Sequence, residues 1–267
     1  MVAGPSSHPP GTHEVAAGAR LVAHCLEGMK NVRGVKARVL TEWPRERAVI
    51  EGARTVVFIG DVFPPVRMAE GARILADLEA MMQRGCGLVC LHFATGLQAK
   101  DLPPDGDHAL LRWMGGYFST GGAAHHKSVA RVFPAVTVTP AAPRHEISRG
   151  WKEFTQDEEP YYNNYFGPGN RMAPNVTALA TAMLPPESPK REVVAWCVER
   201  KDGGRGVAIV MPHFYRNWKG EDFRRFVLNG IVWSAGLKVP RRGVESESPD
   251  LGAFGAESIV PTERKKK

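Results

Sequence analysis

Apolar residues recur along the first half of the chain with two different periods. Residues 14–30 and 69–83 repeat apolar positions every three or four residues, which is the spacing of an amphipathic helix. The runs Thr55–Ile59 and Gly87–Leu91 are almost continuously apolar, as strands are when both of their faces are covered. Residues 35–40 alternate like a half-buried strand. Because strands and helices take turns, we predict a mostly parallel, doubly wound α/β sheet.

The second half of the chain has a mixed pattern. It predicts a short helix, several extra strands and a closing helix, at residues 108–114, 129–138, 176–182, 193–199, 206–211 and 222–235. We place the extra strands and long loops around the edge of the sheet that holds the site. Beyond Pro240 the chain is rich in Ser, Glu, Gly and Pro, which is typical of an extended or disordered segment. We therefore predict one α/β domain over residues 1–240 and a C-terminal arm over residues 241–267.

Composition and charge argue against several classes of partner. The chain has 267 residues, 43% hydrophobic and 24% charged, which is ordinary for a globular protein. Its net charge of +7 includes the four cations of residues 264–267, and no basic stripe with interleaved aromatics accompanies them. No apolar run reaches the roughly 18 residues of a membrane span. We therefore expect neither nucleic acid nor a membrane as partner, and a homo-oligomer stays open.

Two further features bear on the cellular compartment. The four cysteines form no Cys-x-x-Cys pair, which favours buried thiols over disulfides or a zinc knuckle. As written the chain begins without a signal peptide, so we expect a cytoplasmic protein. Residues 1–4 look like the stub of a strand, and a truncated N-terminus, with a periplasmic location, is the alternative.

Histidines stand where predicted strands end. His92 follows the strand Gly87–Leu91, His213 follows residues 206–211, and His8 and His13 lie in the loop after the first short strand. Sites in parallel α/β sheets form in the crevice beyond the carboxyl ends of the strands. We therefore expect these histidines to share one pocket.

Each candidate residue has a functional and a structural interpretation. His92 and His213 are candidates for acid–base catalysis or metal ligation, although each can also be a core histidine satisfied by the backbone. Glu158 stands between two other carboxylates, and crowding of this kind raises a pKa toward that of a general acid. A solvated acidic turn is the simpler alternative for this segment.

The remaining candidates have side chains that suit a sugar. Helix N-termini, amides and aromatic rings bind hydroxyl groups and stack on carbohydrate, and on this basis we assign substrate binding to His8, His13, Glu14, Tyr161, Asn217 and Trp218. The competing interpretation is that these residues fix turns or fill the core. Neutral imidazoles beside carboxylates also suit a divalent metal such as zinc, but no compact His-x-x-x-His or His-Glu-x-x-His pattern is present, so the metal stays unknown.

Together these motifs resemble the ThuA-like family of trehalose-utilisation proteins. The matching segments are Ser-His-Pro-Pro-Gly-Thr-His-Glu (7–14), Gly-Leu-Val-Cys-Leu-His (87–92), Trp-Met-Gly-Gly-Tyr-Phe (113–118), His-Glu-Ile-Ser-Arg-Gly (145–150), Asp-Glu-Glu-Pro-Tyr-Tyr (157–162) and residues 204–218. The resemblance implies a flavodoxin-like sheet, similar to that of class I glutamine amidotransferases, and a role in sugar catabolism on disaccharides or their keto forms. Two positions depart from the family: the first strand is short, and Glu146 stands where proline is common.

Two rival functions remain to be weighed. A glutaminase needs a cysteine nucleophile at a Gly-x-Cys-x-Gly turn, but Leu88 and His92 stand where those glycines would flank Cys90, so we reject it. A non-catalytic carbohydrate-binding or scaffold module needs the aromatics and amides but no proton-transfer group. We predict a sugar-processing hydrolase or lyase whose partner is a small-molecule sugar substrate. Its histidines and carboxylate would carry out acid–base chemistry, with or without a metal, and the binding module is the alternative.

Overall fold

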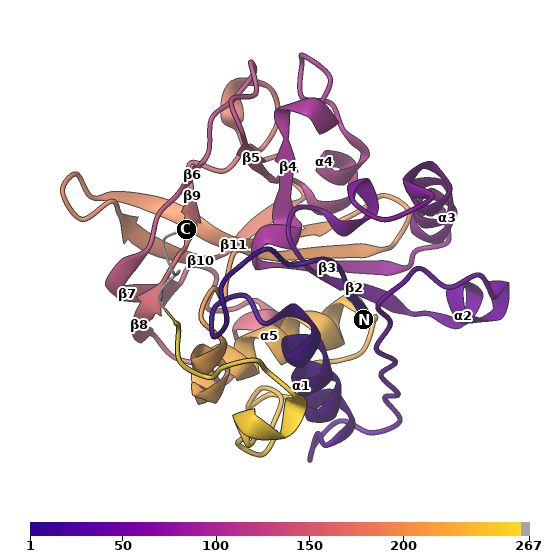
Figure 1. Ribbon diagram of the computed structural model, residues 1–267, viewed down its shortest axis with the longest axis vertical. Coiled ribbons are helices and arrows are strands. Elements are labelled where there is room, and N and C mark those ends of the chain that lie inside the picture. Colours follow the sequence, from indigo (N-terminus) through magenta and orange to yellow (C-terminus); the bar gives the residue numbers. More distant parts are fainter. Residues whose placement is uncertain (263–267) are drawn as a thin grey trace.

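The fold is built around one large sheet, shown in Figure 1. Within residues 1–262, which the computed structural model describes, this sheet has eight strands in the order β1-β2-β3-β12-β11-β10-β7-β8. Their bounds are β1 Val2–Ala3, β2 Thr55–Ile59, β3 Gly87–Leu91, β7 Phe133–Pro140, β8 Phe154–Glu158, β10 Val176–Leu184, β11 Lys190–Glu199 and β12 Arg205–Ile209. Two smaller pairs join β4 (Gly96–Gln98) to β5 (Phe118–Thr120) and β6 (Val129–Ala130) to β9 (Tyr161–Tyr162).

The large sheet is mixed. Strands β1, β2, β3 and β12 run parallel, whereas β12, β11, β10, β7 and β8 are joined by antiparallel pairs. The parallel arrangement predicted from the sequence therefore describes one half of the sheet. The other half differs because β10, β11 and β12 follow one another through short turns, and a short turn can join only antiparallel neighbours.

Helices cover the parallel half from both sides (Figure 1). Helices α1 (Val15–Glu27) and α5 (Glu221–Ser234) pack together on one face, and α3 (Gly71–Gln83) and α4 (Ala109–Met114) lie on the other, with α2 (Arg47–Gly52) beside α3. Each long helix turns an apolar stripe inward: Leu21 of α1, Leu78 of α3 and Phe226 of α5 are completely buried. Burial of such a side chain stabilises the fold by about 1.5–3 kcal/mol.

The predicted elements of the first half match the structure closely, with one exception. Residues 35–40 alternate as a strand does, but only Leu40 pairs, through a parallel bridge to Val2 in which Ala3 N–H donates to Leu40 O at 2.8 Å. Strand β1 has only two residues, so it offers no partner for a longer ladder. In the second half, β7 begins and ends later than the predicted stretch 129–138, and a separate short strand β6 precedes it.

The C-terminal segment lies along the surface of the sheet domain. Residues 241–262 contain one short 3-10 helix, Leu251–Phe254, and bury Val244 and Leu251. The end of the predicted arm and the basic run 264–267 lie outside the described residues. All four cysteines are buried and free. Over the described part of the chain, no helix is both long and apolar enough to cross a bilayer.

Candidate functional site

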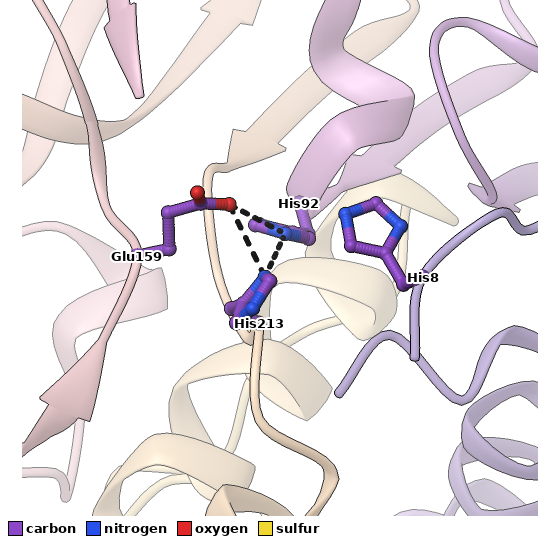
Figure 2. Close-up of side chains that lie close together, drawn as sticks. All are labelled: His8, His92, Glu159 and His213. Atoms are coloured by element: carbon purple, nitrogen blue, oxygen red, sulfur yellow. Dashed lines mark hydrogen bonds and ion pairs between the residues drawn. The ribbon is translucent and has the colours of Figure 1, made fainter. Parts of the chain in front are cut away.

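The parallel strands deliver polar side chains to one edge of the sheet. Strands β1, β2, β3 and β12 end on the same side, and the loops that follow them hold His8, Asp61, His92 and His213. The imidazole rings lie close together: the ring centroids of His8 and His213 are 5.4 Å apart, and those of His92 and His213 are 5.2 Å apart. Figure 2 shows His92 and His213 beside the carboxylate of Glu159, with His8 on the other side of His92 in this view.

His92 is held in an unusual backbone conformation at the end of β3. Its φ of 48° lies in the left-handed region, which non-glycine residues rarely adopt and which recurs at functional sites. Its Nδ1 lies 3.1 Å from the carbonyl oxygen of Val210. Because a carbonyl only accepts, Nδ1 carries the proton and Nε2 keeps its lone pair. Complete burial, followed by the nearby imidazoles, lowers the pKa of His92 well below its ordinary value, so this ring is neutral.

The lone pair of His92 faces a small group of polar atoms. His92 Nε2 lies 3.1 Å from His213 Nδ1 and 3.1 Å from the hydroxyl of Tyr161. The Glu159 carboxylate completes the group, with its Oε2 3.2 Å from His213 Nδ1 and 3.7 Å from His92 Nε2 (Figure 2). The side chain of Glu159 is 19% exposed, so this group is in contact with solvent on one side.

Asp61 orients the two histidines of the first loop. Its Oδ1 accepts from His8 Nδ1 at 2.8 Å and from His13 Nδ1 at 3.0 Å, and its Oδ2 accepts from the backbone N–H and the hydroxyl of Ser7, each at 2.6 Å. Burial alone would raise the pKa of Asp61, but the hydrogen bonds from His13, His8 and Ser7 outweigh it and hold that pKa below its usual range. The ionised carboxylate therefore fixes both Nδ1–H tautomers and leaves each Nε2 with a lone pair.

His13 lies deeper than His8. Burial, the largest cause, lowers the pKa of His13 to about 4, although the hydrogen bond to Asp61 opposes this shift. Its Nε2 is buried and has no partner among the described residues. A buried lone pair without a donor is costly, and such atoms are expected to meet water or a ligand.

Glu158 supports the group from below. Its carboxylate is completely buried and accepts from the backbone N–H groups of His213 at 2.6 Å and Glu159 at 2.9 Å. The amides of Asn217 and Gln156 donate to its other oxygen at 2.9 and 3.0 Å. Burial raises the pKa of Glu158, and these hydrogen bonds oppose the shift. The carboxylate thus ties together the backbones that carry His213 and Glu159.

The sequence matches a family model over most of its length. Residues 11–234 match the model described as ThuA, trehalose utilisation. The chain belongs to the ThuA family. None of the curated proteins compared matches the sequence.

Several solved structures share the fold. A ThuA-like protein of Bacteroides uniformis superimposes with a TM-score of 0.59 at 14% identity, covering 87% of this chain and 89% of the other. A ThuA-like protein of Parabacteroides merdae gives a TM-score of 0.56 at 16% identity and covers 92% and 96%. The carbohydrate deacetylase Agd3 gives a TM-score of 0.50 at 10% identity, covering 88% of this chain but 32% of that protein. At these identities the likeness is one of fold.

In this ThuA-family chain, four residues can offer ligands to a metal ion. Atoms of His8, His92, Glu159 and His213 all lie within 4.8 Å of one another. A second group, His8, His13 and Asp61, satisfies the same distance. In that group, however, Asp61 already accepts both Nδ1–H donors, so it is an orienting partner of the histidines.

The other predicted residues lie around this group in different roles. Tyr161 is buried, stacks on His92 with ring centroids 4.8 Å apart, and keeps its proton because burial raises its pKa well above 10. Asn217 donates to Glu158 and to the carbonyl of Asp157. Trp218 is buried and packs against Phe223. The structure thus places these last two beneath the site.

Glu14 lies at the start of α1 and is engaged by the backbone. Its carboxylate accepts N–H groups from Gly11, Glu257 and Ser258. The carboxylate is therefore committed to three donors of the protein itself.

Two members of the site were not selected from the sequence. Asp61 follows the apolar run of β2 after a single glycine, so the strand-end argument that found His92 applies to it as well. Glu159 adjoins Glu158, and only the register of the chain decides which of the two faces the histidines. Cys90 lies inside β3, completely buried with a raised pKa, and the turn with positive φ is at His92, so the thiol is not placed as a nucleophile.

Proposed function

We propose that this protein is a metal-dependent carbohydrate-processing enzyme, acting on a disaccharide or a keto-glycoside. Membership of a family described by trehalose utilisation supports the substrate class. The observation that carries the chemistry is the convergence of three imidazoles and one carboxylate from separate segments of the chain.

The distances within this group suit metal ligands. Ligands that surround Zn²⁺ tetrahedrally at 2.0–2.1 Å are about 3.3 Å apart, by simple geometry from the usual bond lengths. The three closest atoms, His92 Nε2, His213 Nδ1 and Glu159 Oε2, are 3.1, 3.2 and 3.7 Å apart. In this proposal His92, His213 and Glu159 are therefore the three close ligands, and ligation is one of the two roles that the positions of the two histidines predict. His8 would be the fourth ligand, so water or substrate would take a fifth position.

The hydrogen bonds outside the group favour the same role. Imidazoles that bind metals usually donate their other N–H to a carboxylate or a backbone carbonyl, which fixes the tautomer. His8 donates to Asp61 and His92 donates to Val210 O, each through the nitrogen that is not offered to the group. Imidazole-rich sets favour Zn²⁺ and its transition-metal neighbours over Mg²⁺ or Ca²⁺.

Around such an ion the protein would supply hydrogen bonds. When bound, a divalent metal polarises a carbonyl or lowers the pKa of a water molecule. Tyr161 keeps its hydroxyl proton and can donate it in a hydrogen bond, while His13 offers a neutral, buried Nε2. Glu158, which we predicted as the acidic partner, holds the ligand-bearing backbone in this proposal.

The finer description of the fold belongs to the same proposal. When the bridge at Leu40 is counted, the parallel strands follow the order 35–40, β1, β2, β3, β12, which corresponds to the 2-1-3-4-5 order of flavodoxin-like sheets. Helices on both faces support a doubly wound sheet, and the sharp turn at His92 lies where amidotransferase-like folds place their functional residue.

The test measures metal and sugar together. We expect purified protein to retain a divalent transition metal, and the wild type to bind Zn²⁺ in calorimetry. His92→Ala should weaken Zn²⁺ binding at least 100-fold, while His24→Ala, an exposed histidine on α1, should not change it. Metal-loaded enzyme is then assayed against disaccharides and 3-keto-glycosides, with and without chelator.

Two results would contradict the proposal. Turnover that persists unchanged after complete removal of metal would show that the ion is not needed. Sugar binding that survives His92→Ala and His213→Ala, with no turnover by the wild type, would favour the carbohydrate-binding module instead.

A further inference from the structure

The C-terminal segment lies against the loop that carries His8 and His13. We call residues 249–262 the strap and residues 8–13 the histidine loop. Thr262 N–H donates to Pro10 O at 3.1 Å. At Gly11, which has a φ of 78°, any side chain would meet the carbonyl oxygen of Val260 at 2.1 Å. The backbone of the strap therefore packs directly on the backbone of the histidine loop.

The strap also reaches the segment that carries His213. The hydroxyl of Tyr215 donates to Leu251 O at 3.0 Å, and the N–H of Tyr215 donates to Gly11 O at 3.3 Å. Tyr215 follows His213 by two positions. One segment thus contacts both of the loops that bring imidazoles to the site.

Glu14 joins the strap to the histidine loop. Its Oε1 accepts from Gly11 N–H at 2.7 Å and from Ser258 N–H at 3.1 Å, and its Oε2 accepts from Glu257 N–H at 3.1 Å. One donor belongs to the loop and two belong to the strap. Hydrogen bonds to an ionised acceptor are about twice as strong as neutral ones, so a single charged group holds three backbone positions together.

We propose that Glu14 is a positioning residue, which fastens the strap over the histidine loop and so sets His8 for the metal site. The effect on Zn²⁺ affinity rests on the proposed function, whereas the docking of the strap does not. Because binding energies are reciprocal, an ion that holds His8 in place also favours docking of the strap. Glu14 then acts on the site through the backbone rather than by touching the sugar.

The experiment compares two carboxylates at opposite ends of α1, in the full chain. Glu14→Gln keeps the size of the side chain but replaces one acceptor oxygen with an N–H₂ group that faces a backbone donor. Glu27→Gln is the matched control, because Glu27 accepts one backbone N–H, from Ala37, toward the other end of α1. Hydrogen exchange, Zn²⁺ affinity and urea unfolding are measured for each variant.

We expect Glu14→Gln to speed exchange in residues 8–14 and 257–262 together and to weaken Zn²⁺ binding about tenfold, the lower end of what loss of an orienting partner costs a metal site. Adding Ser258→Pro, which removes a strap donor, should add little to Glu14→Gln if both act through the same contact. Glu27→Gln should leave exchange in these segments and Zn²⁺ affinity unchanged.

Each arm can overturn the inference separately. Unchanged exchange in the strap and loop of Glu14→Gln would show that the carboxylate does not fasten them. Faster exchange with wild-type Zn²⁺ affinity would show that the strap does not position the site. If the wild type itself binds no Zn²⁺, the proposed metal function fails. Hydrogen exchange alone then tests whether Glu14 holds the strap on the histidine loop.

Discussion

Replacement of Asp61 by asparagine tests the hydrogen bonds that orient the site. The backbone N–H of Ser7 cannot accept, so asparagine must turn its oxygen toward Ser7 and its N–H₂ group toward His8 and His13. Each Nδ1 must then accept, which moves the imidazole proton to Nε2. On His8 that nitrogen is the one offered to the metal, and protonation blocks it.

The structure sets the expected size of the effect. Four hydrogen bonds end on the Asp61 carboxylate. A hydrogen bond to a charged acceptor contributes about 1 kcal/mol more than a neutral one, so the free energy of unfolding should fall by about 2–4 kcal/mol. Zn²⁺ binding should weaken by about 10- to 100-fold, as it does when the orienting partner of a ligand is lost.

Three measurements check this reasoning. Urea unfolding gives the stability, calorimetry gives the Zn²⁺ affinity, and ¹⁵N chemical shifts of the imidazoles report the tautomers. Asp101→Asn is the control, because Asp101 also accepts several hydrogen bonds, from Arg67 and Gln98, outside the site. That variant should lose stability and keep Zn²⁺ affinity. An Asp61→Asn protein with wild-type affinity and unchanged tautomers would refute the reasoning.

Three further predictions follow from burial. Cys90→Ser should keep full turnover and Zn²⁺ affinity, because the thiol is buried inside β3. A 1000-fold loss of turnover in an activity assay would instead indicate that Cys90 is a catalytic nucleophile. Glu158→Ala should lower the free energy of unfolding in urea by about 4 kcal/mol or more, because four donors lose their acceptor at about 1 kcal/mol or more each; a loss below 1 kcal/mol would contradict this. Metal-free protein should lose stability as the pH falls from 6.5 to about 4, since unfolding lets His13 take a proton that the folded state refuses until about 4. That difference is worth about 3 kcal/mol. In urea titrations His13→Asn should remove about this part of the stability loss, while His92, whose pKa is also lowered, still contributes its own part.

The strands and helices of the first half could be predicted because their pattern is local. The apolar run Thr55–Ile59 is enough by itself to indicate a strand. The helix predicted over 69–83 is likewise indicated by its own amphipathic spacing, and the structure has α3 there, over Gly71–Gln83. The direction of the later strands could also have been inferred, because the strands predicted at 193–199 and 206–211 leave only residues 200–205 between them. That connection is too short for a parallel crossover and requires an antiparallel pair. Residues 35–40 did not form a full strand because the neighbouring β1 has only two residues to pair with.

Candidate ligands could be found from the sequence because a histidine after a parallel strand lies at a known edge of the sheet. Nothing local distinguishes such a ligand from the residue that holds it in place. Glu158 and Glu159 are adjacent and chemically alike, yet one is buried among four donors and the other faces two imidazoles.

The same limit applies to Glu14, because its two partners in the strap are separated from it by more than 240 positions in the chain. A carboxylate at a helix N-terminus is free to bind a sugar only if no other backbone reaches it first, and that depends on where a distant segment returns. Residue type therefore indicates which chemistry a site can contain, whereas the division between ligands and their supports is decided by long-range contacts. For this chain, the roles of Asp61, Glu158 and Glu14 follow from counting which donors already occupy each carboxylate, since an oxygen that is fully engaged by the protein is poorly placed to bind anything else.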